Sequence, residues 1–359
     1  MDNNTEAFLS LLRAGLWETE TRLAPYGNII FSTVLEMAEV QGVVGLVAAG
    51  IEHIMDGRPA KKDVLPFIGR VTQVEHCNKA MNDFIGVLVD KMQKVGVYTV
   101  LVKGQGVAQC YERPLWRPSG DVDFLLDAEN YRKAKAYLLP LSAGNKNEER
   151  YSQHLGISID SWYVEIHGTL RSGLSARVDR MIDAVQTEVF REGKVRTWKN
   201  DETEVYLPAP DHDVFLVFTH FIKHLYKEGV SLRQVCDWCR LLWTYRSELD
   251  VALQERWLNQ AGLMEEWQVF GVLAVEYLGM PAEAMPLYGA ENLGSGSKLS
   301  RKAKRLLSFI LAGGGQHKVR DTFALAKIFP RNTVKFLPSI FLNVNWLKVR
   351  ERMMGNGLE

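Results

Sequence analysis

The sequence predicts an α+β protein in which a small mixed sheet lies between two helical regions. Residues 1–95 carry apolar residues at three- and four-residue spacing, which is the period of amphipathic helices. After Gly96 the pattern changes to short β-branched runs separated by glycine and polar turns. Helical spacing returns after Pro208. We therefore expect an N-terminal helical region over 1–95, an α/β core over 96–208 and a C-terminal helical region over 209–359.

The expected core contains six short segments with the composition of strands. They are residues 97–104, 121–127, 154–160, 163–168, 196–200 and 203–208. Helical turns are expected between the first two segments, and a helix over Glu129–Leu139 follows an Asp127 cap. After the core, helices are predicted from Asp211, over 231–245 and over Val251–Ala261.

Composition favours a cytoplasmic location. The first residues include Asp2 and Glu6 where a signal peptide carries cations, and no run approaches the roughly 18 apolar residues of a membrane-spanning helix. The chain has four cysteines, too few and too scattered for a disulfide framework, which suits a reducing compartment.

The C-terminal end is basic although the formal net charge of the chain is zero. Thirteen Lys or Arg and only two acidic residues lie between Lys298 and Arg352. These side chains either form solvated helix faces or bind an anionic partner such as nucleic acid, a nucleotide or a phospholipid headgroup. At the end of this segment Lys348, Arg350 and Arg352 accompany an apolar stripe of Phe341, Val344, Leu347 and Met354 that can dock on the rest of the chain.

The most informative motif is Gly120-Asp121-Val122-Asp123-Phe124, at the start of a predicted strand. Side chains two apart in a strand share a face and lie about 6.6 Å apart along the chain. Both carboxylates therefore point the same way, while Val122 and Phe124 point into the core. Such a pair can hold divalent ions.

A second triplet with the same spacing, Asp211-His212-Asp213, serves as an internal comparison. It follows Pro208-Ala209-Pro210 and opens a predicted helix, where acidic residues cap free N–H groups and interact with the helix dipole. We predict a structural role for this triplet.

The neighbourhood of Asp121 and Asp123 supports a catalytic role. Upstream, Lys103-Gly104-Gln105-Gly106 joins a strand to a short helix, a turn that presents backbone N–H groups to a phosphate. Downstream, Glu165 lies on a later strand between apolar neighbours, with His167 on the same strand face.

These motifs resemble the DNA polymerase beta-like nucleotidyltransferase superfamily. The run LVKGQGVAQCY, then RPSGDVDFLL and VEIHGTL, is similar to a poorly characterised nucleotidyltransferase family within it, directly over Val97–Leu170. Two features depart from the superfamily pattern. The usual second glycine or serine of the turn is Gln105, and the gap from the turn to Asp121 is longer than in compact members.

The resemblance implies a polymerase-beta-type core and two Mg²⁺ or Mn²⁺ ions held by Asp121, Asp123 and Glu165. An acceptor hydroxyl would attack the α-phosphorus of a nucleoside triphosphate and expel pyrophosphate, with Glu165 as a further candidate for general base. The acceptor stays unidentified.

Further residues are candidates for nucleotide binding. A cation near the acids can meet a phosphate or pair with an acid, and His167 can orient the site. Arg233 can also form an i to i+4 pair with Asp237. The candidates are Lys103, Gly104, Gln105, Arg117, Gly120, His220, Lys223 and Arg233.

Three other motifs lack the context of the metal, redox or dinucleotide site that their spacing suggests. His220 and His224 lack the adjacent glutamate of a zinc hydrolase. Cys236 and Cys239 lie inside a helical pattern, which predicts core cysteines. Gln109 interrupts a dinucleotide-binding fingerprint.

Two alternatives to an active enzyme remain. One is a catalytically silent relative that binds nucleotide or serves as a helical scaffold. The other is a peripheral protein whose basic end binds nucleic acid or a membrane surface.

Overall fold

The computed structural model describes residues 2–57, 59–142, 147–149, 153–289, 297–315 and 317–341, with backbone alone at 147–149. Lys348, Arg350, Arg352, Val344, Leu347 and Met354 lie outside these residues. The described N-terminal helices are α1 (Asn3–Trp17), α2 (Phe31–Val40), α3 (Val44–Glu52) and α4 (Lys61–Lys94). The described part of residues 1–95 thus contains four α-helices.

The crossing of α1 and α3 is unusually close. A Cβ atom at Gly15 would lie 1.8 Å from the carbonyl oxygen of Leu46, and one at Gly50 would lie 2.0 Å from that of Leu11. Only glycine allows the two backbones to approach this far. The N-terminal helices thus form a tight unit.

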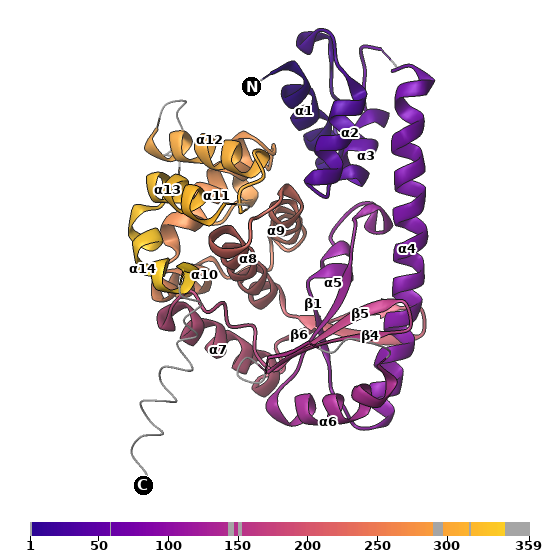
Figure 1. The fold of residues 1–359 in the computed structure, drawn as a ribbon, viewed down its shortest axis with the longest axis vertical. Coiled ribbons are helices and arrows are strands. Elements are labelled where there is room, and N and C mark those ends of the chain that lie inside the picture. Colours follow the sequence, from indigo (N-terminus) through magenta and orange to yellow (C-terminus); the bar gives the residue numbers. More distant parts are fainter. Residues whose placement is uncertain are drawn as a thin grey trace.

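The long helix α4 connects this unit to the sheet. It has 34 residues and extends along one side of the molecule, from the N-terminal helices at one end to the strands at the other (Figure 1). Its C-terminal half packs beneath the sheet through Met81, Ile85, Leu88, Val89 and Met92.

The sheet has the order β1-β2-β5-β4-β3. Its two central strands, β2 and β5, are parallel and the other neighbours are antiparallel. The strands are β1 (Val100–Val102), β2 (Asp121–Leu125), β3 (Asn147–Glu149), β4 (His154–Ile159) and β5 (Trp162–His167). Three of them fall within predicted segments, β5 begins one residue before its predicted segment, and β3 was not predicted.

The alternation along β2 and β5 gives the sheet two different faces. Val122 and Phe124 of β2 join Val164 and Ile166 of β5 in an apolar core with α4 and α6 (Ala128–Leu138). The opposite face carries the carboxylates. As predicted, α6 begins behind Asp127, whose side chain accepts a hydrogen bond from the Asn130 N–H at 2.7 Å.

Three further elements complete the core region. The short helix α5 (Gly104–Ala108) follows β1, and α7 (Ala176–Arg191) follows β5. The predicted hairpin is present as β6 (Val195–Asn200) and β7 (Thr203–Pro208). Val205 and Leu207 of β7 extend the apolar core beneath the sheet.

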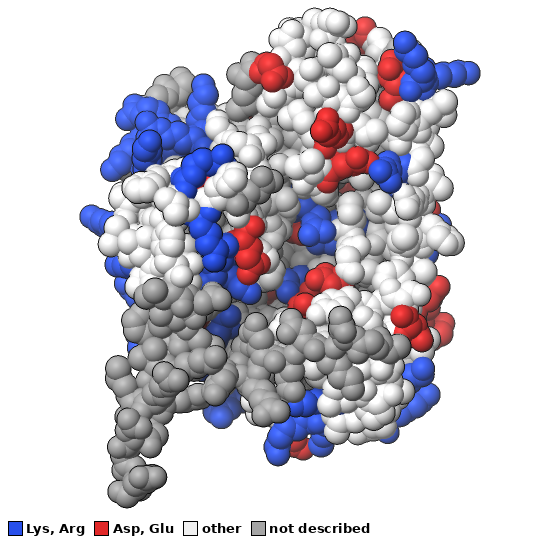
Figure 2. Space-filling model, viewed as in Figure 1, with Lys and Arg blue, Asp and Glu red and all other residues white. Residues whose placement is uncertain are grey.

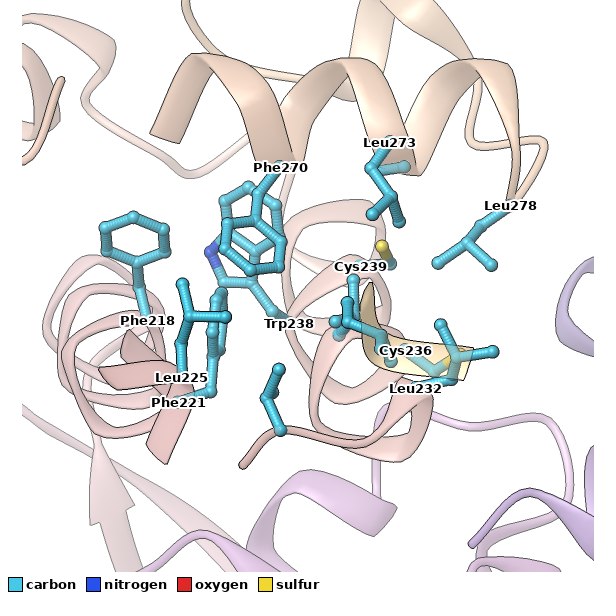
Figure 3. Packing of buried hydrophobic residues seen from close by; sticks show 14 of the residues in the cluster. Phe218, Phe221, Leu225, Leu232, Cys236, Trp238, Cys239, Phe270, Leu273 and Leu278 are labelled. Atoms are coloured by element: carbon cyan, nitrogen blue, oxygen red, sulfur yellow. The ribbon is translucent and has the colours of Figure 1, made fainter. Parts of the chain in front are cut away.

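The C-terminal region is helical. It contains α8 (Pro210–Lys227), α9 (Leu232–Thr244), α10 (Val251–Ala261), α11 (Met264–Glu276), α12 (Lys298–Leu311), α13 (Lys318–Ile328) and α14 (Pro330–Phe341). Phe218, Phe221, Trp238 and Phe270 meet in its core (Figure 3). Cys236 and Cys239 are fully buried in the same cluster, which confirms the prediction of core cysteines. Within the described residues, every helix is too short or too polar to cross a bilayer.

The N-terminal and C-terminal helices share one apolar core although they are far apart in sequence. The Trp17 indole donates a hydrogen bond to the Leu278 carbonyl at 2.6 Å. Gln41 accepts from the Leu232 N–H at 2.9 Å and donates to the Ile310 carbonyl at 3.2 Å. The α/β core is therefore held between helices that are themselves joined.

Candidate active site

The polar face of the sheet brings the three predicted acids together. Asp123 of β2 lies directly opposite Glu165 of β5 in the parallel register, and Asp121 lies two residues before Asp123 on the same face. One carboxylate oxygen from each of the three residues lies within 4.8 Å of the others. This separation suits shared divalent cations.

The three carboxyl groups have different electrostatic surroundings. Burial and the neighbouring Asp123 raise the pKa of Asp121. Burial alone would raise the pKa of Asp123, but the Lys103 ammonium and His167 outweigh it and lower that pKa. Burial also opposes ionisation of Glu165, yet the close approach of His154 and His167 to its carboxylate brings its pKa far below the ordinary value. Asp121 is therefore the one of the three whose ionised form is disfavoured by its surroundings.

Lys103 is the nearest cation. Its Nζ atom donates to Asp123 Oδ1 at 2.8 Å. Its backbone has φ of 60° and ψ of −151°, a conformation that costs a non-glycine residue about 1–3 kcal/mol. Gly104 follows with φ of 42°, and a Cβ there would lie 3.6 Å from the Asp121 carbonyl oxygen. The turn thus directs the lysine at the acids and lies against the start of β2.

Two histidines flank Glu165. His167 Nε2 lies 2.7 Å from Asp123 Oδ1 and 3.3 Å from Glu165 Oε2, while His154 Nε2 lies 3.2 Å from the same Glu165 oxygen. The two rings stack at 4.8 Å between centroids. His167 was expected to orient the site, and this geometry agrees with that expectation.

His154 and Tyr163 were missed from the sequence. His154 is the register partner of His167 across the β4–β5 hairpin, and Tyr163 is the register partner of Asp121. Burial, followed by Glu165 and Asp121, raises the pKa of Tyr163. Pairing the two predicted strands about their short turn would have placed His154 opposite His167.

Helices α8 and α9 face the acids. Burial, and then the charge of Lys103, lower the pKa of His220 well below its ordinary value. The charge of Arg233 partly offsets the raised pKa of Asp121, and its Nη1 atom donates to the Pro118 carbonyl at 3.0 Å. Figure 2 shows a hollow in the middle of the face of the molecule drawn there, with acidic and basic side chains inside it.

Two further residues of α8, His224 and Lys223, both approach Glu228 at the end of the helix. His224 Nε2 lies 2.9 Å from His220 Nε2, and its Nδ1 lies 2.8 Å from Glu228. Lys223 Nζ lies 3.9 Å from Glu228. The His220–His224 pair is therefore a hydrogen-bonded contact.

Arg117 and Gln105 point away from the carboxylates. The Arg117 guanidinium forms two 2.7 Å contacts with Asp237 of α9. Asp237 also accepts from the Tyr111 hydroxyl at 2.7 Å. The expected Arg233–Asp237 pair is wrong, because among the described side chains Asp237 is the ion-pair partner of Arg117. The Gln105 amide donates to Asn78 of α4 at 2.8 Å, and Gly120 is open to space.

The second Asp-x-Asp triplet is structural, as predicted. Asp213 Oδ2 binds Arg196 at 2.7 Å, and Asp211 Oδ1 accepts from the Gln254 amide at 3.0 Å. Burial raises the pKa of Asp213 to about 6. Their contacts are side-chain contacts to neighbouring elements, where simple helix capping was expected.

A separate concavity lies among the C-terminal helices. This basic hollow has a volume of about 800 Å³. Basic side chains gather at the upper left of Figure 2, over α12. Eight Lys or Arg residues line the hollow: Arg177, Lys298, Arg301, Lys302, Arg305, Lys327, Arg331 and Lys335.

The fold and site define a class of α+β protein with a carboxylate cluster on a mixed sheet, opposed by a lysine and covered by helices. The family model described as Uncharacterised nucleotidyltransferase matches residues 29–279, and the chain belongs to this family. Neither a curated protein nor a solved structure matches the chain. Membership gives nucleotidyl transfer as the general reaction and a nucleotide as substrate.

Proposed function

We propose that this chain transfers a nucleoside monophosphate from a nucleoside triphosphate to an acceptor hydroxyl and releases pyrophosphate. The observation that carries the proposal is the convergence of Asp121, Asp123 and Glu165 within 4.8 Å on one sheet face. The proposal includes a cytoplasmic location, where nucleoside triphosphates are available.

The acidic cluster fits divalent cations such as Mg²⁺ or Mn²⁺. Its carboxylate oxygens are hard donors, and the raised pKa of Asp121 reflects burial and the neighbouring charge of Asp123, both of which a bound cation would offset. In the proposal, Asp121 and Asp123 hold the ion on the triphosphate, and Glu165 with Asp123 holds the ion next to the acceptor. The bound ions would supply charge stabilisation for the transferring phosphoryl group.

The side chains around the acids have separate tasks. Lys103 neutralises Asp123 and lies at the turn where the β- and γ-phosphates are expected. His220, Lys223 and Arg233 of α8 and α9 form the wall that would face the nucleotide. Arg117 and Gln105 position the loop and the turn through Asp237 and Asn78, so we assign them no direct phosphate contact.

Glu165 is better suited to hold a cation than to act as general base. A general base works best with a pKa near the operating pH. The pKa of Glu165 lies far below that range because His154 and His167 lie against its carboxylate.

The test is incubation of the purified chain with each labelled nucleoside triphosphate and Mg²⁺ or Mn²⁺, with pyrophosphate release as the readout. Asp121→Asn and Asp123→Asn should abolish release, whereas Asp211→Asn in the structural triplet should retain it. Nucleotide binding without release in the wild type would instead support the silent relative.

We also propose the basic hollow as the site of the anionic partner. Its lining contains eight basic residues and one acidic residue, Glu265, which pairs with Lys302. A compact polyanion would relieve the repulsion among these side chains.

A further inference from the structure

The polar sheet face carries a second group of ligands beside the two aspartates. His154 of β4, Glu165 and His167 of β5 present Nε2, a carboxylate oxygen and Nε2 within 4.8 Å of one another. His154 and His167 are direct cross-strand partners. The strand register therefore aims both imidazoles at one point.

The distances match those of ligands around a single ion. Two atoms each about 2.0–2.2 Å from a tetrahedral cation are separated by about 3.3 Å or slightly more. Glu165 Oε2 lies 3.2 Å from His154 Nε2 and 3.3 Å from His167 Nε2.

The hydrogen bonding leaves a nitrogen available. His154 Nε2 is buried, and within the described residues it has no hydrogen-bond partner. Its short approach to Glu165 thus lacks the geometry of a hydrogen bond, although the atoms are close. A buried, unpaired imidazole nitrogen is costly unless a proton donor or a metal ion satisfies it.

We propose that His154, Glu165 and His167 bind a divalent d-block cation such as Mn²⁺, Co²⁺ or Zn²⁺. Imidazole nitrogen favours these ions, whereas Mg²⁺ prefers oxygen ligands and keeps several waters. The inference rests on the proposed function, because Glu165 belongs to both ligand groups. Glu165 then bridges an oxygen-only position at Asp121 and Asp123 and a nitrogen-containing position at the histidines.

The experiment uses the full chain without a histidine tag and probes it with Mn²⁺ or Co²⁺ alone. Pulsed electron paramagnetic resonance of bound Mn²⁺ should show nitrogen couplings, and Co²⁺ should give ligand-field absorption bands. His154→Ala should weaken Co²⁺ binding by at least about 100-fold, since losing even a ligand's outer partner costs about 10–100-fold. His154→Asn provides a second variant that keeps a polar side chain.

The matched control is His53→Ala, which removes an imidazole that also pairs with a glutamate, at 2.6 Å from Glu18. It should leave the metal spectra unchanged. Oxygen-only coordination of Mn²⁺ in the wild type, or equal Co²⁺ affinity in folded His154 variants, would overturn the inference.

The two proposals fail separately. Nitrogen couplings that depend on His154, in a chain that releases no pyrophosphate, would remove the proposed function and leave the metal site. Pyrophosphate release with Mg²⁺, in a chain without nitrogen couplings, would remove the metal site and leave the proposed function.

Discussion

Arg117 and Asp237 form a bidentate ion pair, with Nε–Oδ1 and Nη2–Oδ2 both at 2.7 Å, that joins the loop before β2 to helix α9. Both side chains are buried. The start of the strand that carries Asp121 is therefore fixed to the wall that carries Arg233.

Asp237→Ala should destabilise the fold by about 3–5 kcal/mol, because it leaves a buried guanidinium without its partner. Urea unfolding measures the change. The comparison is Glu129→Ala, which removes an exposed i to i+4 pair with Lys133 and should cost far less. Equal losses in the two variants would contradict the assignment of the buried pair as a structural joint.

Asp121→Asn and Asp123→Asn should shift the melting temperature of the metal-free protein in opposite directions. Because the pKa of Asp121 is raised in the folded state, its contribution to folding stability is fully present below about pH 3.8. That contribution is lost as the pH rises through the pKa of the folded state. The Asp121→Asn variant should therefore have a higher melting temperature at pH 7, by no more than about 2 °C, since solvent screens a partly exposed group.

The lowered pKa of Asp123 has the opposite sign, with stability present above pH 3.8 and lost as the pH falls through the folded value. The Asp123→Asn variant loses the buried ion pair with Lys103, which should lower the free energy of unfolding by about 3–5 kcal/mol. Differential scanning fluorimetry between pH 4 and pH 8 measures both variants. A shift of the same sign in both at pH 7 would refute this electrostatic account.

Replacing Lys103 should separate backbone strain from charge. Lys103→Gly and Lys103→Ala both lose the ammonium, but glycine accepts φ of 60° without penalty. The glycine variant should be more stable than the alanine variant by about 1 kcal/mol. At Lys79, inside α4, the same comparison should favour alanine by about 0.5–1 kcal/mol. Chemical denaturation of the four variants measures the difference in free energy of unfolding between glycine and alanine at each position, and the two differences should have opposite signs.

The basic hollow should bind a compact polyanion such as inorganic tripolyphosphate. Changing Lys327, Arg331 and Lys335 together to glutamine should weaken binding at least about tenfold and flatten its salt dependence, because fewer counterions are released. Isothermal titration at two salt concentrations measures both effects. The triple change Lys61, Lys62 and Lys91 to glutamine, on exposed parts of α4, should have little effect. Similar losses in the two triple variants would indicate nonspecific charge attraction.

Local patterns in the sequence predict much of the fold and part of the site. The alternation in β2 and β5 is enough to place Asp123 and Glu165 on polar faces and Phe124 and Ile166 in the core, since side chains alternate strictly along a strand. The Asp127 cap likewise depends only on its own neighbourhood.

Features that depend on distant partners could not be read in this way. The position of Asp237 opposite Arg117 requires the docking of α9 on a loop 120 residues earlier. The electrostatic surroundings of Glu165 could not be read from its neighbours in sequence for a related reason, because its pKa depends on His154 and His167. A pKa is set by three-dimensional neighbours.

The Gly15 and Gly50 contacts of α1 with α3 have a mechanical meaning for the whole molecule. Helix α4 connects the N-terminal helices to the sheet, while Trp17 and Gln41 connect them to the C-terminal helices. The chain therefore forms a closed frame around the carboxylate site. A frame of this kind has no single hinge. Widening the gap between the carboxylates and α9 requires simultaneous sliding at two joints, and at one of them the backbones already touch. In the proposed reaction, the space open to an acceptor would thus depend on the joints among helices α1, α3 and α4 as well as on the residues of the site.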